Sequence, residues 1–392
     1  MRCVQVGWFV LMALVGITTT GRCDTRAEDV ALFARWVAAL QYTDPAQTAY
    51  GAVKIHPTAA AVAADGRQYY RVSPYVSNLG VLGLLRSHAS GSVTTAERWI
   101  TWYLRHLTPE SAPDGVPFEH FYLADGTGET VCVKPGDPHL CRYNDATDSA
   151  AATFFLVLQA YLEAGGRSSF LNTAEKKAQV EHLAEVLLAL QDSDGLFWAK
   201  RDYRVKYLED NSEVYAGLVA LSHLEETAFK NGERAKAYAA AAERVRRAIQ
   251  TEMYDPAVQA YRVAKFENKT YTRTDLNVWF PDMQAQLWPL LFGVISPSAP
   301  RSQAALHALN EHWNGQNRPN WASTPEKVDQ GHIHADIAYA ALLAGDIKQV
   351  EIYRRAARRF VFPHPPDSAG FAWPFSVGEA GWLLTLLHHF PL

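Results

Sequence analysis

The sequence predicts an all-α protein built from twelve helices in six pairs. Three observations support this fold class. Helical spacing of apolar residues dominates the 392-residue chain. Amphipathic segments alternate with segments that are apolar or small almost all round. Short connections alternate with long ones. We therefore expect six outer helices with one face in water and six inner helices that are buried.

The helices are expected in chain order, each outer helix followed by its inner partner. The expected pairs are residues 26–41 and 74–87, 94–107 and 146–164, 174–191 and 211–229, 233–253 and 278–294, 301–313 and 331–344, and 347–360 and 376–389. The segments AERVRRAIQ and EIYRRAARRF illustrate the outer type, with one charged face. The segments NLGVLGLL and AGWLLTLL illustrate the inner type, which has no polar face and is stable only when buried.

The connections predict where function lies. Turns after inner helices are as short as KNG or GD, whereas outer helices are followed by long returns. The returns are residues 43–73, 108–145, 192–210, 254–277, 314–330 and 361–375. All six would gather at one rim, just before the N-termini of the inner helices. Their turn-forming and β-prone residues predict short β-hairpins, and long loops in compact domains commonly carry function.

Composition excludes several classes of protein. The chain is 48% hydrophobic and 20% charged, with a formal net charge of −4. It can therefore bury a large core, and it lacks the basic excess of a nucleic-acid-binding protein. Residues 1–23 contain Arg2 and an apolar run of about a dozen residues, which is typical of a secretory signal peptide. We expect residues 24–392 to form one domain that is secreted or periplasmic, monomeric, without a membrane span and without a cofactor or metal.

The four cysteines fit export. Cys3 and Cys23 belong to, or border, the expected signal peptide. Cys132 and Cys141 lie in one polar loop, and an oxidising compartment favours a disulfide between them over two free thiols. The cysteine and histidine spacing of a zinc site is not present.

Two groups of acids precede buried helices. Asp145 and Asp148 lie in YNDATDS, three residues apart, so they share a helix face. Helix capping is the alternative, and it explains one of these acids better than both. The second group lies in YLEDNSEVYAG and comprises the acids Glu209, Asp210 and Glu213, with Asn211 among them as an expected helix cap. Within it Glu213 is favoured, because the helix that follows has no polar face and should point this side chain toward the axis of the ring.

Two further rim acids are candidates. Glu379 in FSVGEAGW lies among aromatic residues, and an apolar surrounding raises the pKa of a carboxyl group, as a general acid requires. A first-turn acid that stabilises the helix dipole is the alternative. Asp282 follows Pro281 at another expected helix start, where capping again competes with a role in substrate binding.

Histidines and aromatic residues complete the rim. His332 and His334 in QGHIHADIAY do not share a helix face, so a sugar hydroxyl or carboxylate is a better ligand for them than a metal. Aromatic rings in the long loops offer apolar faces on which sugars stack, although loop packing must account for some of them. The residues selected for substrate binding are Tyr75, Tyr143, Trp198, Trp279, Asp282, Trp321, His332, His334 and Trp373.

The alternation of six outer and six inner helices, with long loops at one rim, resembles the (α/α)6 toroid of the six-hairpin glycosidases. YNDATDS before a buried helix and GEAGW at the last helix are similar to acid-bearing helix starts in enzymes of this fold. The resemblance covers residues 26–392. It implies an active site at the N-terminal rim of the inner helices and hydrolysis that is commonly inverting. Lyases and epimerases also use this fold.

Together these observations predict an exported glycoside hydrolase that acts on a poly- or oligosaccharide. Two carboxylates would divide acid and base roles, with Asp145 or Asp148 as one partner and Glu213 or Glu379 as the other. A polysaccharide lyase or sugar epimerase on the same fold is one alternative, with Tyr143 and His334 as the acid and base. A glycan-binding protein without catalytic activity is the other.

Overall fold

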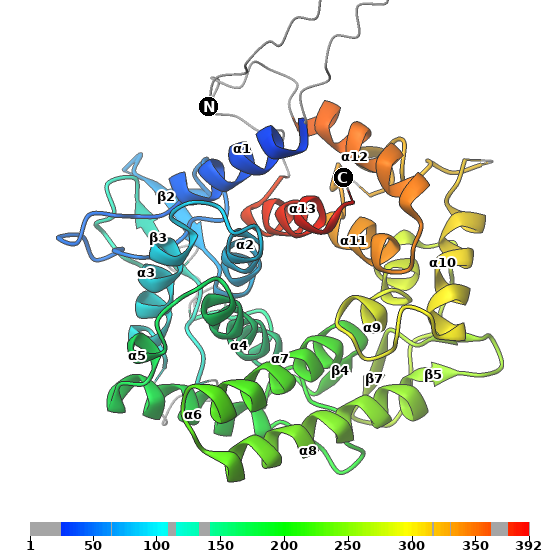
Figure 1. The fold of residues 1–392 in the computed structure, drawn as a ribbon, viewed down its shortest axis with the longest axis horizontal. Helices are drawn as coiled ribbons and strands as arrows, with labels where there is room; N and C mark the ends of the chain where they lie inside the picture. Colours follow the sequence, from blue (N-terminus) through cyan, green and yellow to red (C-terminus); the bar gives the residue numbers. More distant parts are fainter. Residues whose placement is uncertain are drawn as a thin grey trace, which may run out of the picture.

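Helices form two concentric rings in the computed structural model of the protein (Figure 1). The structure describes residues 25–63, 65–108, 115–132, 142–315, 317–329, 331–361 and 375–391. The expected signal peptide, residues 1–23, lies outside these ranges and stays a prediction. The all-α fold class is confirmed.

The outer ring consists of α1 (Thr25–Ala39), α3 (Ser92–Arg105), α6 (Ala174–Leu188), α8 (Gly232–Ala248), α10 (Pro300–His312) and α12 (Ile347–Val361). The inner ring consists of α2 (Pro74–Arg86), α4 (Thr147–Glu163), α7 (Leu208–Thr227), α9 (Trp288–Leu291), α11 (Ala335–Leu343) and α13 (Val377–His389). Short helical turns complete the set: α5 (Ser168–Leu171), η2 (Ile249–Met253), η3 (Trp279–Met283) and η4 (Pro325–Lys327). No helix among the described residues is both long and apolar enough to cross a membrane.

The inner ring closes on itself. Each inner helix contacts the next, and α13 contacts α2, so the last helix of the chain meets the first inner one (Figure 1). Gly83 and Gly381 allow this closure, because a Cβ atom on Gly83 would overlap the backbone of Gly381. The two backbones thus approach more closely than any larger side chain permits.

The core lies between the two rings and inside the inner one. Every residue of α4 from Thr147 to Leu158 is buried, as the absence of a polar face predicts. Outer helix α3 packs on α4 through Tyr103 and Phe154, whose rings stack with centroids 3.8 Å apart. Much of the aromatic content therefore serves packing between the rings rather than a cleft at the rim.

The fourth inner helix differs from expectation. A helix over residues 278–294 is wrong, because the chain forms η3, bends and then forms only the four-residue α9. Phe280 has a non-helical backbone, the Phe280–Pro281 peptide bond is cis, and Pro289 interrupts the segment again. Proline supplies no backbone N–H group, so a continuous helix loses hydrogen bonds here.

Short strands fill the long returns, as predicted. β1 (Ala61–Val62), β2 (Gln68–Val72) and β3 (His120–Leu123) form an antiparallel sheet in that order. Antiparallel pairs also join β4 (Val205–Tyr207) to β7 (Ala264–Phe266), and β5 (Tyr254–Asp255) to β6 (Ala260–Tyr261). The sheets lie in the loops at the rim where the inner helices begin.

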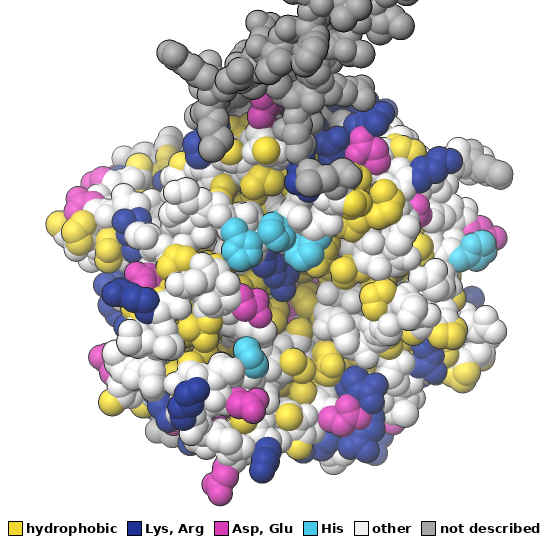
Figure 2. Space-filling model, in the orientation of Figure 1, with side chains coloured by type: hydrophobic (Ala, Val, Ile, Leu, Met, Phe, Trp, Pro, Cys, Tyr) yellow, Lys and Arg dark blue, Asp and Glu magenta, His cyan; other side chains and the backbone are white. Residues whose placement is uncertain are grey.

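The two ends of the inner ring differ in their ionisable residues. Acidic residues occupy the first turns of α4, α7, α11 and α13. At the other end, Arg86, His88, His388 and His389 line a pocket of about 230 Å³. Figure 2 shows histidine side chains gathered over the centre of the ring on the face in view. The acidic first turns complement the helix dipoles, which favour anions at N-termini.

Candidate active site

A pocket of about 580 Å³ opens where α4 and α7 begin, beside the bend at Pro281. Three carboxyl groups line it, together with a lysine and several aromatic rings. The lining residues are Tyr143, Asp145, Ala146, Ala199, Lys200, Tyr203, Tyr207, Glu209, Asp210, Val263, Phe280, Pro281 and Trp288. This is the rim where the sequence places the active site.

Asp145 forms an exposed wall of the pocket. It precedes α4, whose N-cap residue Ala146 has an extended backbone and no capping side chain. The hydroxyl group of Tyr143 donates a hydrogen bond to Asp145 Oδ1 over 2.9 Å. Lys200 fixes the same loop, because its Nζ donates to the carbonyl oxygen of Asn144 over 2.9 Å. Asp145 therefore does not cap the helix, and its carboxylate is open to water.

Asp148 lies beneath the pocket in the first turn of α4, with no exposed surface. Its Oδ1 accepts the backbone N–H of Ser149 over 2.9 Å, whereas its buried Oδ2 has no partner in the described part of the chain. Burial and then the charge of Asp210 raise the pKa of Asp148 well above its usual range. The structure thus separates the two acids of YNDATDS, one in the pocket and one below it.

The first turn of α7 supplies the other two carboxyl groups. This helix begins at Leu208, three residues before its expected start, so Glu209 and Asp210 belong to it. Both line the pocket. Burial, and next the charge of Asp145, raise the pKa of Asp210 to about 7. Burial and the charge of Glu213 raise the pKa of Glu209 as well.

Glu213 lies one turn further along α7 and is buried below the pocket. The hydroxyl group of Tyr75 donates to its Oε1 over 2.9 Å, and its Oε2 has no partner among the described residues. Burial raises the pKa of Glu213 above its usual range. The sequence placed Asp210 and Glu213 in the same group of acids but favoured Glu213 as the catalytic residue. The early start of α7 turns Asp210 toward the pocket, and boundaries of this kind are the weakest part of a sequence-based prediction.

Glu379 ties α13 to the start of α11. Its two oxygens accept the backbone N–H groups of His334 and Ala335 over 3.2 and 3.1 Å. Ser376 caps α13 itself, with its side chain accepting the N–H of Glu379. Burial is the main cause that raises the pKa of Glu379. Its geometry is that of a cap on the neighbouring helix α11, a structural role that differs from the dipole role considered for this acid.

The expected helix at 331–344 starts only at Ala335, because His334 has a left-handed backbone with φ of 47°. His334 Nε2 lies 3.1 Å from Asp329 Oδ2. Burial opposes its charge, but the hydrogen bond to Asp329 and nearby carboxylates outweigh burial and raise the pKa of His334. His332 is exposed beside it, with the two rings 5.8 Å apart.

Several selected residues hold the loops in place. Asp282 Oδ1 accepts the backbone N–H of Asp275 over 2.7 Å. Trp279 is buried edge-to-face on Trp313, with centroids 5.1 Å apart. Trp321 is buried and donates through Nε1 to Asn310 Oδ1 over 3.0 Å. These three side chains have packing or turn-stabilising roles in the loops. Loop packing and capping are the alternatives to substrate binding given for them above.

Trp198 is covered by a cation. Lys206 Nζ lies 4.0 Å from its ring centroid, and the same buried ammonium group contacts Asp192 and Asp194 at 2.6 and 2.7 Å. The aromatic rings that do face the pocket were missed apart from Tyr143. They are Tyr203, Tyr207, Phe280 and Trp288. Tyr203 and Tyr207 both lie in the long return 192–210. The criterion that selected the other aromatic residues, a position in a long loop, therefore also applied to them.

Two selections fall outside the described residues. Trp373 is one, and its role stays a prediction. Cys141 is the other, so the Cys132–Cys141 disulfide also stays a prediction.

Comparisons with known proteins bear on the fold. No protein-family model matches the sequence. No curated protein matches it either. Solved structures of similar fold include a glycosidase at 15% identity and TM-score 0.61, which covers 93% of this chain and 98% of its own. A GH76 alpha-mannanase from Bacteroides thetaiotaomicron shares 10% identity at TM-score 0.55 and covers 94% and 97%. A GH78 rhamnosidase from Bacillus sp. GL1 shares 14% at TM-score 0.58, covering 92% of this chain and 34% of the enzyme.

These likenesses establish the fold. The chain has a helical toroid similar to that of these solved glycosidases, as the sequence predicted. At 10–15% identity they do not transfer an activity or a catalytic residue.

Proposed function

We propose that the protein is a glycoside hydrolase that cleaves a poly- or oligosaccharide in the pocket between α4 and α7. The observation that carries the proposal is Asp210, a pocket carboxyl group with a pKa of about 7 next to the exposed carboxylate of Asp145. Glycoside hydrolysis needs two carboxyl groups whose surroundings separate their protonation states. The fold supports the proposal, since the similar structures are glycosidases.

Asp210 is the proton donor in this proposal. A carboxyl group with a pKa of about 7 holds its proton over the acidic half of the pH range and in half of the molecules at neutrality. It can therefore protonate the oxygen of the leaving sugar while the glycosidic bond breaks. Asp148 and Glu213, buried beneath, are positioning residues that keep its surroundings poor in water.

Asp145 is the base in this proposal. It is open to water, and its Oδ1 accepts a hydrogen bond from the hydroxyl group of Tyr143, which orients the side chain. It would remove a proton from a water molecule that attacks the anomeric carbon from the opposite face. This arrangement gives inversion of configuration.

Aromatic rings on the pocket wall supply binding. Tyr143, Tyr203 and Phe280 are 39%, 48% and 53% exposed, so part of each ring is accessible to a ligand. Lys200 Nζ lies 5.2 Å from the centroid of Tyr143, and the ring of Tyr203 stacks on that of Tyr207. Sugar C–H groups pack against accessible aromatic faces. Lys200, which also lines the pocket, could donate to a sugar hydroxyl group.

The lyase alternative is less well supported by the same residues. A lyase with Tyr143 as the acid and His334 as the base would need an unprotonated His334 in the pocket. Burial opposes the charge of His334, but its hydrogen bond to Asp329 and nearby carboxylates outweigh burial and raise its pKa, and His334 does not line the pocket. Burial and then the charge of Asp145 raise the pKa of Tyr143 to about 12, and its hydroxyl group donates to Asp145. Tyr143 is therefore protonated at neutral pH and is suited to holding Asp145.

Incubation with a panel of neutral and acidic polysaccharides and oligosaccharides tests the proposal. New reducing ends measure cleavage, and proton NMR of the first product gives its anomeric configuration. Inverted product that is lost in Asp145→Asn supports the assignment. Product that is unaffected by Asp145→Asn but lost in Glu379→Gln would move the base to Glu379.

A further inference from the structure

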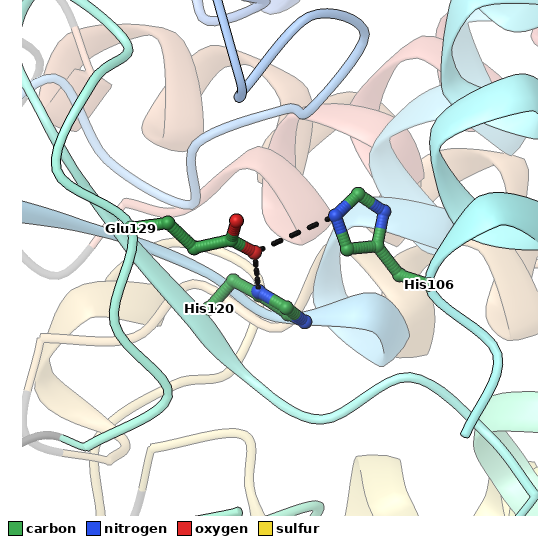
Figure 3. Close-up of side chains that lie close together, drawn as sticks. All are labelled: His106, His120 and Glu129. Carbon is green, nitrogen blue, oxygen red and sulfur yellow. Dashed lines mark ion pairs between the residues drawn. The ribbon is translucent and has the colours of Figure 1, made fainter. Parts of the chain in front are cut away.

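Two histidines and a glutamate from three separate segments meet between the end of α3 and β3. His106 directly follows α3, His120 begins β3, and Glu129 lies in the turn after β3 (Figure 3). Their ligand atoms all lie within 4.8 Å of one another. None of the three lines the carbohydrate pocket. We propose that they bind one zinc ion, independently of the proposed hydrolase activity.

His106 is oriented as a metal ligand. Its Nδ1 donates to the carbonyl oxygen of Trp102 over 2.7 Å, and its ring stacks on that of Trp102 with centroids 4.3 Å apart. This hydrogen bond fixes the tautomer, so Nε2 carries a lone pair. Nε2 points at Glu129 Oε1, 3.5 Å away (Figure 3). Metal-binding histidines almost always use their second nitrogen in this way.

His120 is the buried ligand, with 6% of its surface exposed. Its Nδ1 lies 2.6 Å from the same Glu129 oxygen, yet it has no well-aligned hydrogen-bond partner in the described part of the chain. Both imidazoles thus converge on one carboxylate oxygen. The 2.6 Å contact has the length of a hydrogen bond, and a tetrahedral zinc ion would hold His120 Nδ1 and Glu129 Oε1 about 3.3 Å apart, so binding requires a small movement of the Glu129 side chain.

Tyr122 completes the cluster. Its hydroxyl group lies 3.0 Å from Glu129 Oε1 and 3.4 Å from His106 Nε2, and it accepts the indole N–H of Trp102 over 3.1 Å. It is therefore held where it can hydrogen-bond to a water molecule that fills a fourth coordination position. Three protein ligands and one water form a known tetrahedral arrangement for zinc.

The donor set selects the class of metal. Two imidazoles and one carboxylate favour zinc and its transition-metal neighbours, whereas calcium and magnesium require mainly oxygen ligands. Sequence spacing did not reveal the site, because the fold brings together residues 14 and 9 positions apart with no recognisable motif. The ion would fasten the β-sheet to the end of outer helix α3.

Zinc titration of the full chain tests this proposal. The sample is prepared without a polyhistidine tag, and any bound metal is first removed with a chelator. Isothermal titration with zinc chloride should give one ion per chain and a raised melting temperature. His106→Gln together with His120→Asn should weaken binding at least 100-fold, and Glu129→Gln at least 10-fold, with unchanged far-UV circular dichroism.

Two control variants separate this site from other histidines. His307→Gln removes an exposed histidine that lies 3.6 Å from Glu311, and it should bind zinc as the wild type does. His388→Gln with His389→Gln removes a pair at the opposite end of the inner ring. The proposal is overturned if the folded wild type binds no zinc, or if binding persists without His106 and His120 or disappears only with His388 and His389.

Discussion

Asp210 and Asp145 come from the starts of two different inner helices and line one pocket. Burial, followed by the charge of Asp145, raises the pKa of Asp210 to about 7. The exposed member of the pair thus helps to keep a proton on the buried one. This relationship between Asp145 and Asp210 is the basis of the proposed division into base and acid.

Replacing Asp210 by asparagine should lower kcat by about 10²- to 10⁴-fold, the usual contribution of a general acid. The side chain keeps its size but can no longer transfer a proton. Steady-state rates on the substrate found by the panel measure the effect. Glu225→Gln is the matched control, because Glu225 lies on the same helix with a pKa also raised to about 7, outside the pocket.

The alkaline limb of kcat/KM, which reports the free enzyme, should have its midpoint near pH 7, where Asp210 loses its proton. In Asp145→Asn the residual activity should have this limb at lower pH, because a charge that raises the pKa of Asp210 is gone. Rates measured from pH 5 to pH 9 test both points. A limb that moves upward in Asp145→Asn would contradict the coupling.

Glu225→Gln should stabilise the protein at alkaline pH. Burial, and then the charge of Glu181, raise the pKa of Glu225 from 4.5 to about 7, and neither carboxyl oxygen has a partner among the described residues. Between these values the folded state holds a proton that the unfolded state has lost, so stability falls as pH rises and then stays low above pH 7. The shift corresponds to about 3 kcal/mol.

Urea unfolding at pH 4.5 and pH 8 measures this effect. The variant should gain up to about 3 kcal/mol over the wild type at pH 8 and little at pH 4.5. An equal difference at both pH values would show that ionisation of Glu225 does not cause it.

Gly83→Ala should destabilise the closed ring. The added Cβ overlaps the backbone of Gly381, and backbone cannot move aside as a flexible side chain does. We expect a loss of about 3 kcal/mol or more in the free energy of unfolding, the upper part of the range for overpacking. Gly232→Ala is the control, because a Cβ there meets nothing within 4 Å at the start of α8. Thermal unfolding of both variants gives the comparison.

Glu379→Gln should cost about 1–2 kcal/mol in stability, because an amide can accept only one of the two backbone N–H groups at the start of α11. Glu243→Gln, on the exposed face of α8, should change stability by less than about 0.5 kcal/mol. If Glu379 is only a cap, kcat of its folded variant stays within a few-fold of wild type. A loss as large as that in Asp210→Asn would make it a catalytic residue.

Periodicity was sufficient to predict the architecture. The alternation of polar-faced and apolar helices depends only on which faces are buried, and eleven of the twelve expected helices are present within the described residues. The exception at 278–294 contains Pro281 and Pro289, whose effect on the backbone was underestimated. A short apolar segment with two prolines satisfies helical spacing without being able to form the helix.

The site was predicted less completely, for two physical reasons. The choice of Glu213 over Asp210 depended on where α7 begins, and a shift of three residues changes which acid faces the pocket. The choice among aromatics depended on burial, which the sequence does not give for loops. Trp321 packs near Tyr353 and is buried, whereas Phe280 is exposed at the pocket because of the bend at Pro281.

The mass of the products formed by wild type and Asp210→Asn, side by side on the carbohydrate panel, tests the central claim most directly. We predict wild-type fragments that have gained one water per bond broken, and a loss of these fragments in the folded variant. Unsaturated fragments from the wild type, or equal hydrolysis by the two proteins, would contradict the assignment of Asp210 as the acid of a glycoside hydrolase.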